Sequence, residues 1–244
     1  MNDFIIPDWP APPSVAAIST SRNGGVSQGP WQSLNLGCNS GDNPADVAEN
    51  RQRLNQVLPA PPRWLQQVHG NAVVVHEGEA TLAHGQVQSD AQWSREKAAV
   101  CAVLSADCLP VLFCNRQGTR VAAAHAGWRG LAAGVLENTV TAMAVPASEL
   151  MAWMGPAIGP LVYQVGDDVR SAFLQQEAEG AGAFVADGDR WLFDICAMAR
   201  HRLQRAGVGH ISGGGYCTYS EPGRFFSYRR DRVTGRMASL VWLV

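Results

Sequence analysis

The chain has 244 residues, of which 46% are hydrophobic and 16% charged, and its formal net charge is −2. This composition is typical of a globular protein and excludes a disordered or fibrous chain. A charge so close to neutrality also argues against nucleic acid as a partner, because nucleic-acid-binding proteins carry a marked basic excess.

The N-terminal segment, MNDFIIPDWPAPP, has neither the basic region nor the apolar run of a signal peptide. No stretch of the sequence approaches the roughly 18 to 20 apolar residues of a membrane span. We therefore expect a cytoplasmic protein without a membrane partner. Its six cysteines should be mostly reduced thiols. They form no CxxC pair, which argues against a structural zinc finger or a thioredoxin-type redox motif.

The first predicted elements are a strand and a helix. Residues 15–21, VAAISTS, predict a strand, which is followed by a loop rich in Gly, Ser and Asn. Asn43 is suited to cap a helix, Pro44 fits its first position, and Asp46 favours the positive end of the helix dipole. These three residues together predict a helix that begins at Pro44.

Two further strands are predicted at residues 63–68 (RWLQQV) and 72–77 (AVVVHE). The intervening His69-Gly70-Asn71 indicates a tight turn or a bulge. His69 is therefore expected at the end of a strand. A histidine in such a place is more often a structural residue than a ligand.

The central segment 98–114, AAVCAVLSADCLPVLFC, is almost continuously apolar. Runs of this kind are typical of strands that are buried on both faces of a sheet. Pro110 cannot donate to a strand ladder, so we predict two strands with a break at residues 107–110.

The second half continues the alternation of strands and helices. Predicted strands cover residues 120–125 and 150–155, predicted helices cover 126–144 and 167–176, a strand enters a helix over 191–207, and FFSYRRD with MASLVWLV forms a closing hairpin. Strands and helices mixed throughout predict an α/β layered domain, with mixed β-sheets covered by helices. Without repeats or long linkers, residues 1–244 are expected to form one domain.

Three residues with metal-binding side chains stand where predicted strands stop: His69, Cys108 and His125. Two histidines and one cysteine form a three-ligand zinc set, and three protein ligands leave the fourth position for water or substrate. The sequence therefore predicts a catalytic Zn²⁺ site. Cu²⁺ is possible at the same ligands, because it outbinds Zn²⁺ at most ligand sets.

Asp107 interrupts the apolar central segment directly before Cys108. Aspartate often caps a turn through backbone hydrogen bonds, which is one interpretation. A carboxylate at this place is also suited to orient a ligand or to accept a proton. The sequence leaves both interpretations open.

Positive charge is expected beside the metal ligands. In HAGWRG (125–130), Gly127 and Gly130 allow the backbone to approach a ligand, and Arg129 lies at a predicted helix start, which favours anions. The arginine-rich stretch RFFSYRRDRVTGR (224–236) suits a small anionic molecule or, equally well, a solvated surface.

The motifs QQVHG, SADCLPVLFC and AAAHAGWRGLAAGV together resemble the bacterial YfiH family, whose members are described as laccase-domain proteins, polyphenol oxidases and purine nucleoside phosphorylases. TSRNGGVS, SLNLG, GPAIGP and FFSYRRD extend the resemblance over nearly the whole chain. It implies an α/β fold like that of Cys–His toxin deamidases, with zinc held by His69, Cys108 and His125.

The resemblance also implies phosphorolysis of adenosine, inosine, guanosine and methylthioadenosine, together with deamination of adenosine. In such a metal-dependent enzyme, whose partners are purine nucleosides and phosphate, Asp107 is the candidate for handling protons. Arg129 or Arg22 is expected to hold phosphate. Asn35 is expected to bond a sugar or base, and Arg229 to add charge.

Three other functions stay open at this stage. Cys108, activated by His125 or His69, would suit an amide hydrolase that edits peptidoglycan precursors. Copper-dependent phenol oxidation, also attributed to relatives, is expected at most as a side activity, because the chain has only six histidines and no HxH pair. A metal-stabilised binding module is the non-enzymatic alternative.

Overall fold

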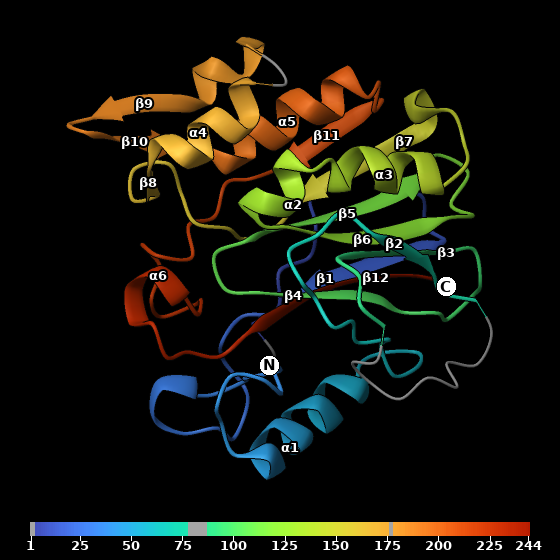
Figure 1. The fold of residues 1–244 in the computed structure, drawn as a ribbon. Coiled ribbons are helices and arrows are strands. Elements are labelled where there is room, and N and C mark those ends of the chain that lie inside the picture. Colours follow the sequence, from blue (N-terminus) through green and yellow to red (C-terminus); the bar gives the residue numbers. More distant parts are fainter. Residues whose placement is uncertain (1–2, 78–86, 176–177) are drawn as a thin grey trace.

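The computed structural model describes residues 3–77, 87–175 and 178–244 (Figure 1). Antiparallel strands form a three-stranded sheet in the order β1 (Val15–Ser19), β12 (Met237–Leu243), β4 (Cys101–Ser105). A six-stranded mixed sheet has the order β11 (His210–Gly213), β7 (Leu150–Met154), β5 (Leu109–Asn115), β6 (Val121–Ala126), β3 (Ala91–Ser94), β2 (Val73–Val75). A small sheet contains β8 (Gln164–Val165), β10 (Arg190–Phe193) and β9 (Phe184–Asp187).

The two larger sheets pack face to face through alternate residues of their strands. On β5, Leu112 and Cys114 point to the three-stranded sheet, where they join Val103 of β4 and Val241 of β12 in one buried cluster. Val111 and Phe113, which alternate with them along β5, belong to the cluster on the opposite face of the six-stranded sheet. Because β5 is buried on both faces, its sequence is continuously apolar, as predicted.

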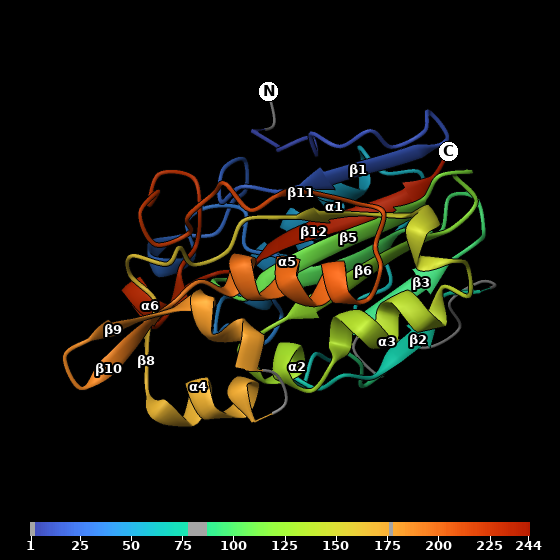
Figure 2. The same ribbon diagram turned by 90° about the horizontal axis from the view of Figure 1, so that it is seen from above.

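Helices cover the outer faces of both sheets (Figures 1 and 2). The six-stranded sheet carries α2 (Trp128–Ala132), α3 (Val135–Ala142) and α5 (Ile195–Arg205). Helix α4 (Asp167–Leu174) packs against α2 and the small sheet, and α1 (Pro44–Asn55) lies beneath the three-stranded sheet. The α1 start is as predicted: Asn43 accepts a hydrogen bond from the Ala45 amide at 2.9 Å. The α/β class is confirmed. In the described part of the chain, every helix is too short or too polar to cross a membrane.

The predicted helix at 126–144 is two helices, and the prediction of one continuous helix is wrong. Between α2 and α3, Gly134 adopts φ +90°, a left-handed conformation that suits glycine and breaks a helix. The break lets α2 stay short beside the end of β6. The periodic apolar residues still face the sheet in both halves.

The predicted C-terminal hairpin is also wrong. FFSYRRD contains the short helix α6 (Tyr228–Asp231), while β12 pairs with β1 and β4. Ser227 caps α6 by accepting a hydrogen bond from the Arg230 amide, and the Arg230 guanidinium binds the carbonyls of Thr218, Tyr219 and Phe225. These bonds satisfy the backbone of this region without a strand partner.

The segment 63–68 forms isolated bridges rather than the predicted strand. Gln67 replaces backbone pairing with its side chain: its Nε2 donates to the Leu104 carbonyl at 2.8 Å, and its Oε1 accepts from the Leu104 amide at 2.7 Å. Because the side chain of Gln67, and not its backbone, pairs with Leu104, the backbone can turn at this point toward His69.

Candidate metal centre

The site lies where β6 ends and where β3 and β5 begin. β6 is antiparallel to both neighbours, with Ala126 opposite Leu109 of β5 and Ala124 opposite Ala91 of β3. The residue before β5 is Cys108 and the residue before β3 is Asp90. Antiparallel pairing therefore brings both beside His125, the penultimate residue of β6.

His69 reaches the same edge from a loop that is wrapped around Asp90. The Asp90 carboxylate accepts hydrogen bonds from the backbone amides of Val68 (3.1 Å), His69 (3.0 Å) and Gly70 (2.7 Å). His69 itself has φ +60°. Three amide donors around one buried carboxylate hold this unusual turn, and with it the His69 side chain.

The structure brings the three predicted ligands together. Their ligand atoms all lie within 4.8 Å of one another, and His69 Nε2 is 3.9 Å from Cys108 Sγ. The rings of His69 and His125 meet edge to face, with centroids 5.0 Å apart. His125 is buried, Cys108 half-buried and His69 exposed, so the cluster opens to solvent on one side. This donor set fits zinc, for which two imidazoles and a thiolate are customary ligands.

Asp90 fixes the orientation of His125. Its Oδ1 accepts a hydrogen bond from His125 Nδ1 at 2.9 Å, and its side chain is fully buried. With Nδ1 used in this way, Nε2 is the ring nitrogen that faces the cluster. Burial opposes ionisation of Asp90, but the bonds from His125 and Gly70 outweigh it and lower its pKa. Asp90 is the main site residue that sequence reasoning missed.

Without metal, the cluster favours an ion pair between thiolate and imidazolium. Burial alone would raise the pKa of Cys108, but the charge and hydrogen bond of His125, aided by His69, lower it to about 6. For His125 the two effects have the opposite direction: burial alone would lower its pKa, but the charges and hydrogen bonds of Cys108 and Asp90 raise it to about 9. The sulfur is therefore in the form that both metal binding and nucleophilic attack require.

Gly127 and Gly130 leave room for the metal ligands and for the loop that carries His69. A Cβ on Gly127 would lie 2.9 Å from His69 Cδ2 and 3.1 Å from Cys108 Sγ. A Cβ on Gly130 would lie 2.6 Å from the Gly70 carbonyl oxygen. Both glycines thus allow the start of α2 to close over the His69 loop.

Asp107 connects the Cys108 strand to α6. Its Oδ1 accepts a hydrogen bond from Thr218 Oγ1 and its Oδ2 from the Arg229 amide, both at 2.6 Å. Asp107 also has φ +91°, a strained conformation for a residue with a side chain. Neither donor belongs to the turn at Asp107, so the carboxylate joins this turn to two distant segments, and each of its oxygens has a protein donor.

Arg229 and Tyr163 stand beside the cluster. Arg229 donates from Nη1 to the Gln164 carbonyl at 2.8 Å, and its Cζ is 5.2 Å from the centre of the Tyr163 ring. Burial raises the pKa of Tyr163, and the negative charge of Cys108 adds to the rise. Tyr163, which follows the motif GPAIGP, was missed by sequence reasoning. Arg129 is exposed, with its guanidinium 4.3 Å from the Trp128 ring.

The other two residues predicted to bind substrate, Arg22 and Asn35, form hydrogen bonds within the protein instead. Arg22 donates to the carbonyls of Gln32 (2.8 Å) and Pro222 (2.9 Å). Asn35 is fully buried, and its amide binds Ser40, Asp42, Gly37 and the Arg236 backbone. A side chain without accessible surface cannot touch a sugar or base, so the structure does not support that role for Asn35.

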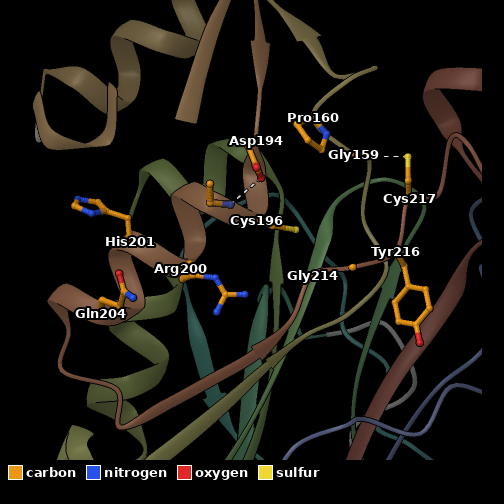
Figure 3. A pocket seen from close by; sticks show the side chains of 12 residues that line it. Gly159, Pro160, Asp194, Cys196, Arg200, His201, Gln204, Gly214, Tyr216 and Cys217 are labelled. Carbon is orange, nitrogen blue, oxygen red and sulfur yellow. Dashed lines mark hydrogen bonds between the residues drawn. The ribbon is translucent and has the colours of Figure 1, made fainter. Parts of the chain in front are cut away.

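A cavity of about 420 Å³ lies between α5 and the glycine-rich segment after β11 (Figure 3). Asp194, Arg200 and Tyr216 line it, together with the thiols of Cys196 and Cys217. Its lining shares no residue with the His69–Cys108–His125 cluster. The Arg200 guanidinium donates hydrogen bonds to the carbonyls of Ile211 and Gly213. Cys217 Sγ accepts a hydrogen bond from the Gly159 amide.

Comparison with known proteins places this site in a family. A family model described as multi-copper polyphenol oxidoreductase laccase matches residues 16–244. The Escherichia coli protein named purine nucleoside phosphorylase YfiH is 54% identical over 246 residues, covering all of both chains. The chain belongs to the YfiH family of laccase-domain proteins.

Other YfiH relatives agree in sequence and in fold. A Pseudomonas aeruginosa protein named purine nucleoside phosphorylase is 54% identical over 245 residues, covering 100% of this chain and 99% of its own. The crystal structure of a Neisseria meningitidis protein, 51% identical, superposes with a TM-score of 0.94 over 99% of both chains. YlmD of Geobacillus stearothermophilus, 33% identical, gives 0.87 over 96% of this chain and 94% of its own.

Proposed function

We propose that this protein is a zinc-dependent purine nucleoside phosphorylase that accepts adenosine, inosine, guanosine and methylthioadenosine, and that it also deaminates adenosine. The observation that carries the proposal is the His69–Cys108–His125 cluster in a chain that is 54% identical, end to end, to a protein named purine nucleoside phosphorylase. Three protein ligands leave a coordination position open for chemistry.

In phosphorolysis, a phosphate oxygen attacks the ribose C1′ while the bond from C1′ to the purine nitrogen breaks, giving ribose 1-phosphate and the free base. A zinc ion held by the three ligands would supply a positive centre that polarises a reacting group. Arg229 would hold negative charge beside it. The half-buried Tyr163 ring would form an apolar wall.

In deamination, water replaces the amino group at the purine C6, and ammonia leaves. The proton must pass from water to the departing nitrogen. Asp107 is the proposed acceptor, because each of its carboxylate oxygens keeps a lone pair beside the one hydrogen bond that it accepts. An Asp107→Asn variant that loses deamination but keeps phosphorolysis would support this role.

The phosphorylase proposal is tested with purified, zinc-loaded protein and inosine. We expect hypoxanthine and ribose 1-phosphate only when phosphate is present, and no product from His69→Ala or Cys108→Ala. Hypoxanthine release that is independent of phosphate would instead identify a hydrolase. Ammonia release from adenosine tests the second activity separately.

A second candidate is an amide hydrolase acting on peptidoglycan precursors. It is favoured by one observation: Cys108, His125 and Asp90 form a chain in which the sulfur has a lowered pKa and the imidazole is oriented by a carboxylate. The thiolate would attack the amide carbonyl, His125 would protonate the leaving amine, and water would release the acyl group. A chelator should abolish the zinc reaction but spare this one.

The laccase name of the family model suggests copper. In the residues that the structure describes, His69, Cys108 and His125 are the one group of three or more potential ligands that converge. A multicopper oxidase needs several such centres, whereas this cluster offers a place for a single Cu²⁺. We therefore propose phenol oxidation only as a side activity of a copper-loaded form.

A further inference from the structure

Arg236 is a half-buried arginine whose position is tightly defined and which the proposed mechanism has not used. Its backbone amide donates to Asn35 Oδ1 at 2.9 Å, and its Nη1 donates to the carbonyls of Thr234 and Gly235, each at 2.9 Å. Its aliphatic stem passes over Gly37, where a Cβ would lie 2.7 Å from Arg236 Cγ. The loop around Asn35 is thus shaped to hold this one side chain.

The short helix α6 links Arg236 to Asp107, the residue before Cys108. Asp107, the neighbour of Cys108, accepts the Arg229 amide and so fixes the start of α6. The ring of Tyr228, the first residue of α6, has its centre 6.0 Å from Arg236 Cζ. Burial lowers the pKa of Arg236, while the negative charges of Cys108 and Asp107 act to raise it.

The guanidinium retains unused binding capacity. In the part of the chain that the structure describes, no carboxylate forms an ion pair with Arg236, and neither Nε nor Nη2 has a protein acceptor. Neither nitrogen is fully buried, so both are accessible to an incoming anion. The planar fork of arginine matches the oxygens of phosphate.

We infer that Arg236 binds inorganic phosphate next to the His69–Cys108–His125 cluster, with Asn35 as the residue that positions it. This inference rests on the proposed phosphorolysis and names the group that holds its anionic co-substrate. It replaces Arg22 and Arg129 in that role. Arg22 donates to backbone carbonyls from both Nε and Nη1, whereas Arg236 does so only from Nη1. Arg22 also interacts electrostatically with Arg230 and Asp231 rather than with Cys108, and Arg129 is exposed.

The first test measures the binding of inorganic phosphate by calorimetry, with and without zinc. We expect Arg236→Gln to weaken binding by at least about 10-fold, which equals about 1.4 kcal/mol. Arg236→Lys keeps the positive charge but loses the planar guanidinium group. Its phosphate affinity should lie between those of the wild type and Arg236→Gln. Arg95→Gln is the matched control, because Arg95 is an exposed arginine paired with Glu77. Acetate, a carboxylate of single charge, should not compete.

Unchanged phosphate affinity in Arg236→Gln, or no phosphate binding by the wild-type protein, would overturn the inference. Circular dichroism establishes that each variant is folded, and Arg236→Lys supplies the comparison if Arg236→Gln is not. The kinetic counterpart is a KM for phosphate that rises about 10-fold while the KM for inosine stays within about two-fold. If phosphate binding depends on Arg236 but no nucleoside is cleaved, the proposed function fails and the phosphate site stands.

Discussion

Asp90 and His125 are joined twice: His125 Nδ1 donates to the Asp90 carboxylate at 2.9 Å, and the His125 amide donates to the Asp90 carbonyl at 2.7 Å. The same carboxylate receives the backbone amide of His69. One buried residue thus orients one predicted metal ligand directly and holds the loop of another. The geometry of the cluster depends on it.

Replacing Asp90 by Asn should weaken zinc binding by about 10- to 100-fold, because residues that orient metal-binding histidines typically contribute that much. An asparagine keeps the size of the side chain but removes the charge that supports the His125 imidazole. Competition with a zinc-binding dye measures the affinity. Asp189→Asn, in the exposed turn between β9 and β10, is the control. Equal zinc affinity in the two variants would contradict the assigned role of Asp90.

Replacing Gly127 by Ala should disrupt the cluster while the fold persists. The new Cβ would meet His69 and Cys108 at 2.9 and 3.1 Å, distances that force the ligands to move. We expect zinc affinity to fall by about 10-fold or more, with a melting temperature close to that of the wild-type protein. Gly182→Ala, where a Cβ meets nothing within 4 Å, is the matched control. Normal zinc affinity in Gly127→Ala would show that the ligands tolerate the crowding.

Metal-free Cys108 should react with iodoacetamide at neutral pH. Because its pKa is lowered to about 6, the thiolate predominates above that pH, and the rate should reach half its maximum near pH 6. Peptide mass spectrometry separates Cys108 from the exposed Cys38, which serves as a reference. Bound zinc should protect Cys108, and His125→Ala should move the midpoint upward. A midpoint that stays near pH 6 in His125→Ala would exclude His125 as the cause.

His76 should make the protein less stable in acid. Burial, aided by Arg63, lowers its pKa to about 4, below the 6.5 of an unperturbed histidine. The unfolded chain therefore takes up the proton first, and stability falls as the pH drops from 6.5 toward 4. The full loss is about 3 kcal/mol, the free energy that corresponds to a histidine pKa of about 4 in the folded chain and 6.5 in the unfolded one. Urea unfolding of the wild type and of His76→Gln should diverge in that range, and parallel pH profiles would contradict this.

Much of the local structure follows from nearby residues. The start of α1 is determined by Asn43 and Pro44. The break in the central segment was expected at residues 107–110 because of Pro110, but it lies at residues 106–108, and Pro110 is part of β5, opposite His125. The helix break has a local cause, Gly134 itself, but the apolar periodicity on both sides of it predicted one continuous helix. The replacement of a strand by α6 was not predictable from nearby residues, because the Arg229 amide donates to Asp107, which lies 122 residues earlier in the chain.

The amino-acid sequence was enough to predict the two histidines and one cysteine as ligands, the order of most strands and helices, and the family. Which residues surround those ligands follows from the way the chain folds. Asp90 reaches the site because β6 pairs with β3 and β5, and Arg229 lies near Cys108 because α6 is anchored on Asp107. Side-chain chemistry is a local property of the chain, whereas proximity between distant segments arises only when strands pair and cores pack.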